Sequence, residues 1–214
     1  MRIVIIFKAL FIATLIFVLF SCASIGGRQT IDPDSVAAYF PREKMIKVFE
    51  GGFENEGMIH VIDRIGRNRI QVKQIDYGTG AALLYQVGNN EARWIYAQEV
   101  HLFEDNYLRQ RPNRDILMLK GPLRMGTSWE DETGASYAIT GVNVSVDTPA
   151  GEFRTIEVTF RRGEFEMKRY YARGMGEVKT QTDYFGTRLI EYSYDIDILD
   201  KIESYYELLV IYFR

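Results

Sequence analysis

The chain has 214 residues, of which 47% are hydrophobic and 26% charged, and its formal net charge is -3. This length favours one sizeable domain, and the composition is that of a folded protein, which argues against disorder. A mildly acidic chain lacks the clustered Lys and Arg that nucleic-acid binding requires, and its single cysteine excludes an internal disulfide.

Residues 1–21 have the pattern of a signal peptide. Arg2 and Lys8 form a short basic start, and residues 9–20 are an uncharged run that is apolar except for Thr14, of the length that the apolar region of a signal has. The run ends in Leu19-Phe20-Ser21-Cys22, which resembles the bacterial lipobox. This resemblance implies cleavage before Cys22, diacylglycerol on its sulfur and acylation of the new amino terminus, which together would hold the protein stably on a membrane.

Two other interpretations of this segment stay open. Residues 3–20 could form an uncleaved membrane helix in which Lys8 snorkels, or the signal could be an ordinary one in which Cys22 has no role. If Cys22 is lipidated, residues 22–31 are expected to form a flexible tether and the protein to face an extracytoplasmic space. Ala23, and not Asp, follows the cysteine, which by resemblance to the known sorting rule favours the outer membrane where the host has one.

From residue 32 to the C-terminus we expect a single antiparallel β domain. It begins with one helical turn near residues 35–39, before the first strand. Turn signals recur every eight to twelve residues, and Gly88-Asn89-Asn90 is a strong hairpin signal. About a dozen short strands of this kind predict an all-β sandwich, barrel or open half-barrel. Residues 199–214 fit a helix or a strand, and we favour a terminal helix. Strands are predicted over residues 45–50, 58–64, 69–77, 81–87, 92–100, 115–120, 137–146, 153–160, 165–172, 177–182 and 188–194.

Three pieces of the C-terminal half occur in an order that resembles a known module. They are a "PL-x-x-G-x-x-W" start at residues 122–129, a "TPAG-x-F" hairpin at 148–153 and a "YYA-x-G-x-G-x-V" strand and turn at 170–178. The order is similar to that of a module in a family of uncharacterised bacterial lipoproteins and related exported proteins, over about residues 118–195. The resemblance implies an exported β module and assigns no catalytic residue.

Signals for enzymatic chemistry are weak. The two histidines, His60 and His101, lie on different segments, and neither metal-ligand spacings nor a phosphate-binding glycine loop occur. We therefore predict no metal, no cofactor and no enzyme. Glu130-Asp131-Glu132 follows Trp129, and paired carboxylates beside an aromatic ring occur in sugar-processing sites. A solvated turn is the preferred interpretation of this cluster.

The aromatic side chains leave a binding function open, because an apolar concave sheet face can hold an acyl chain. The leading hypothesis is a non-enzymatic binding or envelope-assembly module with a protein partner or an amphipathic ligand. A lipid carrier with a half-barrel cavity is the second and an envelope hydrolase the third. An apolar cavity of several hundred cubic ångströms would favour the carrier, and a filled core the assembly module. The candidate ligand-binding residues are Tyr85, Trp94, Tyr96, Phe160 and Tyr170, with Tyr192 and Tyr194 as further members of the same face.

Overall fold

The computed structural model describes residues 34–51, 57–76, 79–99, 105–201 and 205–213. The chain divides into two units, Met1–Ile31 and Asp32–Arg214. The predicted signal peptide, the lipidation site Cys22 and the predicted tether all fall in the first unit, outside the described residues. His101, in the second unit, is also outside them. The fold described below is that of the second unit.

Twelve antiparallel strands form one sheet, in the order β6-β5-β4-β3-β2-β1-β12-β11-β10-β9-β8-β7. The predicted all-β class with a barrel-like sheet is therefore confirmed. The strands are β1 (Met45–Gly51), β2 (Met58–Ile65), β3 (Arg69–Ile75), β4 (Gly80–Val87), β5 (Glu91–Glu99), β6 (Ile116–Lys120), β7 (Ser128–Glu130), β8 (Ser136–Thr148), β9 (Gly151–Arg162), β10 (Phe165–Ala172), β11 (Gly176–Gln181) and β12 (Gly186–Ser193).

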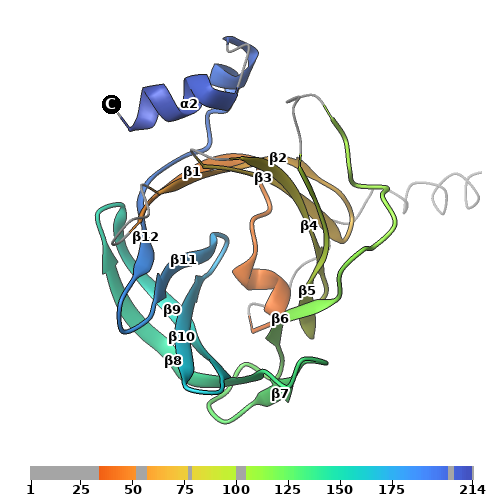
Figure 1. The fold of residues 1–214 in the computed structure, drawn as a ribbon, viewed down its shortest axis with the longest axis vertical. Coiled ribbons are helices and arrows are strands. Elements are labelled where there is room, and N and C mark those ends of the chain that lie inside the picture. Colours follow the sequence, from red (N-terminus) through yellow and green to blue (C-terminus); the bar gives the residue numbers. More distant parts are fainter. Residues whose placement is uncertain (1–33, 52–56, 77–78, 100–104, 202–204, 214) are drawn as a thin grey trace, which may run out of the picture. The chain divides into compact units, whose positions relative to one another are not determined.

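The sheet curls until its two edge strands, β6 and β7, approach each other (Figure 1). The indole Nε1–H of Trp129 in β7 donates a hydrogen bond of 3.1 Å to the carbonyl oxygen of Leu117 in β6. On its other side the Trp129 ring stacks on Tyr137 of β8, with 5.5 Å between ring centroids. Trp129 thus joins the two edges of a nearly closed barrel. The short strand β7 lies in a part of the chain for which the sequence predicts no strand.

A short 3-10 helix, η1 (Val36–Tyr39), lies inside the curled sheet (orange in Figure 1). The sequence predicts a helical turn here, and its apolar residues explain its position, because Val36 is fully buried and Tyr39 is 6% exposed. Two backbone hydrogen bonds hold the segment. Val36 N–H donates to Asn89 O at 2.9 Å, and Gly174 N–H donates to Ala38 O at 2.8 Å. The predicted β4–β5 hairpin turn therefore also anchors the helix.

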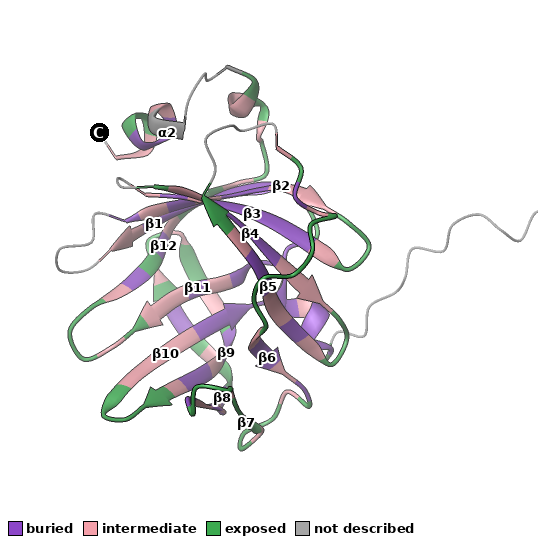
Figure 2. Ribbon diagram, turned by 45° about the vertical axis from the view of Figure 1, so that its right-hand side comes forward, coloured by how far each residue is buried: buried purple, intermediate pink, exposed green. Residues whose placement is uncertain are grey.

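The strands β1 to β5 are buried on both faces, and Figure 2 shows the contrast with the exposed hairpin ends of β9–β10 and β11–β12. Their outer face packs against Tyr107 and against Leu208 and Leu209 of helix α2 (Tyr205–Tyr212), which follows the 3-10 helix η2 (Asp197–Lys201). The predicted terminal helix is confirmed, although it is shorter than residues 199–214. Within the described ranges, no helix has the length and apolar character needed to cross a membrane.

A buried polar cluster fixes the loop after β5 to this outer face. Lys73, with 1% of its side chain exposed, forms an ion pair of 2.9 Å with Asp63. The Gln71 amide donates to Asp63 at 3.0 Å and to the backbone oxygen of Asp105 at 3.0 Å, and accepts from Tyr107 N–H at 2.7 Å. These contacts account for three polar side chains on an otherwise apolar face, so this cluster has a structural role.

Candidate functional site

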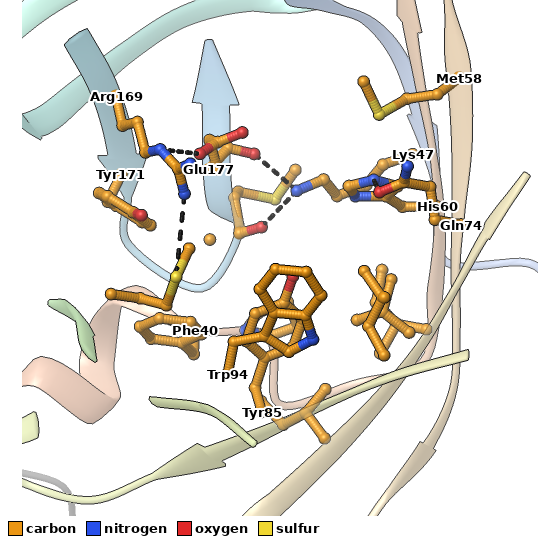
Figure 3. A pocket seen from close by; sticks show the side chains of 18 residues that line it. Phe40, Lys47, Met58, His60, Gln74, Tyr85, Trp94, Arg169, Tyr171 and Glu177 are labelled. Carbon is orange, nitrogen blue, oxygen red and sulfur yellow. Dashed lines mark hydrogen bonds and ion pairs between the residues drawn. The ribbon is translucent and has the colours of Figure 1, made fainter. Parts of the chain in front are cut away.

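A cavity of about 220 Å³ lies inside the barrel (Figure 3). One wall consists of inward-facing residues of β1 to β5, and the opposite wall comes from β10, β11 and the turn between them. Phe40 and Pro41, directly after η1, and Met118 of β6 complete it. The full lining is Phe40, Pro41, Lys47, Met58, His60, Ile62, Ile70, Val72, Gln74, Leu83, Tyr85, Trp94, Met118, Arg169, Tyr171, Met175, Gly176 and Glu177.

The wall formed by β2 to β5 is mainly apolar, since alternate residues of a strand face the same side. Ile70 and Val72 of β3 and Leu83 of β4 continue the inner core to the cavity surface. Trp94 presents its ring here, because its indole N–H is already bonded to the Tyr96 carbonyl oxygen at 2.7 Å. The Trp94 ring can therefore contact an apolar group without leaving its own N–H unsatisfied.

The other pole of the cavity is charged. Lys47 is 4% exposed, and its ammonium donates to the backbone oxygens of Met175 at 2.8 Å and Glu177 at 2.7 Å. Burial lowers the pKa of Lys47 to about 8, against the opposing effect of the Glu177 carboxylate. Burial also raises the pKa of Glu177, opposed by Arg169 and Lys47. Two cations and one carboxylate thus meet at one end of the cavity.

Arg169 reaches the cavity from the middle of β10. Its Nε lies 3.8 Å from a carboxylate oxygen of Glu177, and one terminal nitrogen contacts the Met118 sulfur at 3.8 Å. The side chains of Arg169 and Glu177 keep 27% and 26% of their surfaces accessible to solvent. Because both residues line the cavity, this accessible surface faces the cavity.

His60 is a neutral member of the lining. It pairs directly with Lys47 across β1 and β2, and its Nε2 lies 3.2 Å from the Gln74 amide oxygen. Burial lowers the pKa of His60 to about 3, and the Lys47 charge adds to this effect, while the Gln74 hydrogen bond opposes it. The imidazole therefore adds hydrogen-bonding capacity to the cavity but no charge at neutral pH.

The structure separates the aromatic residues that the sequence predicts as one face. Tyr85 and Trp94 line the cavity, but Tyr96 is in the outer core beside Tyr107, with ring centroids 6.0 Å apart. The reason is a bulge: Leu84 pairs with Tyr96 and Tyr85 with Trp94, so Ile95 is an extra residue in β5. One extra residue moves the following side chains to the opposite face.

The remaining predicted candidates also lie away from the cavity lining. Phe160 packs on Tyr137, with 5.0 Å between ring centroids. Tyr170 is buried, and by alternation it faces the side of β10 opposite to Arg169 and Tyr171. Tyr192 and Tyr194 are 39% and 54% exposed.

The charged cavity residues were not among the candidates. One signal for Lys47 is present in the sequence, because it alternates with two apolar residues, Met45 and Phe49, on the inward face of β1. No comparable signal identifies Arg169, Tyr171 or Glu177, since their convergence depends on how the sheet closes.

The acidic cluster after Trp129 organises a turn. Asp131 accepts hydrogen bonds from the Thr133 hydroxyl at 2.6 Å, the Ala135 N–H at 3.1 Å and the Tyr137 hydroxyl at 3.0 Å. The hydrogen bond from the Thr133 hydroxyl is the main reason why the pKa of Asp131 is lowered. Glu130 and Glu132 are exposed. The cluster caps the β7–β8 turn, as the preferred interpretation expects.

No protein-family model matches the sequence, and no curated protein is significantly similar to it. Two solved structures are similar in shape. One, from Bacteroides fragilis, is described as an exported protein with a YmcC-like fold, is 10% identical and has a TM-score of 0.46. The other, from Parabacteroides distasonis, is described as a lipoprotein, is 14% identical and has a TM-score of 0.43. Each match covers 72% of this chain and 98% of the other.

Proposed function

We propose that this chain is a membrane-anchored, extracytoplasmic lipoprotein whose barrel binds a small amphipathic ligand without catalysing a reaction. The observation that supports the binding function is the cavity of about 220 Å³, with an apolar wall at Trp94 and a charged pole at Arg169. A protein that served only as a scaffold would fill this space with side chains, because protein interiors are close-packed. An interior space that also contains charged groups favours a ligand.

The size of the cavity limits the ligand. Pockets for drug-sized molecules measure about 300–1,000 Å³, and this cavity of about 220 Å³ is smaller. It also falls below the several hundred cubic ångströms that we set as the expectation for a lipid carrier. A short amphiphile, or one short chain of a larger molecule, fits this space better than a whole two-chain lipid.

The anchoring part of the proposal rests on the lipobox-like Leu19-Phe20-Ser21-Cys22. We expect Cys22→Ala to abolish incorporation of labelled palmitate and to release the protein from membranes or leave it unprocessed. Cys22 is the sole cysteine, so no other thiol can take the lipid. Unchanged labelling and fractionation of the variant would refute the anchor.

The binding part can be tested on protein purified from its own membranes. Solvent extraction and mass spectrometry should detect a small amphiphile in the wild-type sample. Val72→Phe adds volume at the apolar wall and should reduce the amount of this molecule several-fold. Identical extracts from a folded Val72→Phe protein and the wild type would contradict binding in the cavity.

A further inference from the structure

The charged pole of the cavity contains polar groups that the protein itself does not satisfy. The Tyr171 hydroxyl is buried, with 2% of the residue exposed, and makes no hydrogen bond of ordinary geometry within the described part of the chain. Nε of Arg169 also makes no hydrogen bond, although it forms an ion pair of 3.8 Å with Glu177. Buried polar atoms in native proteins almost always have a partner, either in the protein or in a bound molecule. Two such atoms on the wall of one cavity indicate a polar ligand group.

The charge of the pole indicates the sign of this group. Lys47 and Arg169 are cations, Glu177 is the carboxylate beside them, and His60 is neutral. One positive charge is therefore left uncompensated, and a buried charge is costly unless it is paired. Lys47 already donates to two backbone oxygens, so its position is set by the fold. Arg169 is the cation that remains available.

The contacts of Arg169 indicate where the anion would lie. Its Nε edge faces Glu177, while a terminal nitrogen contacts the thioether of Met118 at 3.8 Å. A thioether is a weak acceptor on a flexible side chain and is easily displaced. A guanidinium presents parallel N–H groups that match the two oxygens of a carboxylate. Tyr171 follows Arg169 on the same face of β10 and can donate its hydroxyl proton.

We infer that the ligand is a monoanionic amphiphile whose carboxylate binds Arg169 and the Tyr171 hydroxyl, with its apolar part against the wall formed by β2 to β5. This inference rests on the proposed binding function and specifies the chemical class of its ligand. A monoanion neutralises the pole, whereas a neutral alcohol leaves the charge of Arg169 uncompensated.

The test compares two probes that differ only in the head group, octanoate and octanol. Each is titrated by calorimetry into the mature lipidated protein in nanodiscs, with empty nanodiscs as the blank. We expect octanoate to bind the wild type at least about tenfold more tightly than octanol, the factor that about 1.4 kcal/mol represents. Arg169→Gln should bring the two affinities together.

Tyr171→Phe is the matched variant, because it removes one hydroxyl and keeps the ring. It should weaken octanoate several-fold, leave octanol unchanged and change the melting temperature little, since the hydroxyl makes no hydrogen bond of ordinary geometry within the described residues. It therefore keeps the test valid even if Arg169→Gln does not fold. Equal binding of both probes to the wild type would overturn the anion site and leave the proposed function standing. Binding of neither probe would overturn both.

Discussion

Acidification should destabilise this protein through a single half-buried histidine, His60. His60 lies in the cavity wall beside Lys47, its partner on the neighbouring strand. Its pKa is lowered to about 3, mainly by burial and further by the Lys47 charge. An unfolded histidine has a pKa of about 6.5. Because the folded value is the lower one, protons bind preferentially to the unfolded chain. The neutral His60 therefore leaves the free energy of unfolding at its full value above pH about 6.5, and this free energy decreases as the pH falls toward 3.

The magnitude follows from these two pKa values. At pH 5 the unfolded histidine is almost fully protonated and the folded one is not, which corresponds to about 2 kcal/mol relative to pH 7.5. For a domain of this size that is a large fraction of a typical unfolding free energy of about 5–15 kcal/mol. The loss begins well above the range in which carboxylates titrate.

The assay is urea unfolding of the wild type and His60→Gln at pH 7.5 and pH 5. Gln at this position cannot be protonated and keeps hydrogen-bonding capacity toward Gln74. Its unfolding free energy should fall by about 2 kcal/mol less than that of the wild type. His101 is the other histidine of the chain and remains in both proteins, so the difference isolates His60. Equal pH dependence of the two proteins, or an NMR titration of His60 near pH 6.5, would refute the reasoning.

Two substitutions test how the barrel is held together. Trp129→Phe removes the indole hydrogen bond to the Leu117 carbonyl and should lower the unfolding free energy by about 1 kcal/mol or more; an unchanged urea midpoint would show that this bond does not hold the seam. Gly186→Ala would place a methyl group against the Thr180 carbonyl oxygen and should lower the free energy of unfolding by about 1–3 kcal/mol. Gly88→Ala is the control, because the nearest atom to the new methyl group is 3.5 Å away, and it should lower this free energy far less. Similar losses in the two glycine variants would mean that the crowding at β12 is not the cause.

Local patterns predicted most of the strands because turns and alternation are short-range properties. The hairpin signal Gly88-Asn89-Asn90 lies between β4 and β5, where Gly88 N–H donates to Glu91 O at 2.8 Å. Strand β7 spans only Ser128–Glu130, which is too short to show alternation. Its place in the sheet depends on pairing with β8.

The aromatic candidates do not lie on one face of the sheet, for a different reason. Alternation assigns a face only while the register is continuous, and the bulge at Ile95 turns Tyr96 outward while Trp94 stays inward. The charged pole could not be predicted either. Lys47 and Arg169 are far apart in the sequence, and both reach Glu177 only because the sheet brings β1, β10 and β11 close to one another.

The most direct test of the binding cavity uses its own tryptophan. The chain has two tryptophans, Trp94 in the cavity wall and Trp129 at the seam. Trp129→Phe leaves Trp94 as the only tryptophan, which is excited selectively over the tyrosines, and 8-bromooctanoate carries a heavy-atom quencher on a chain that suits the cavity. We predict saturable quenching of Trp94 and much weaker quenching of Trp129 in the Trp94→Phe protein. Quenching that rises linearly and equally in both variants would contradict a ligand-binding barrel.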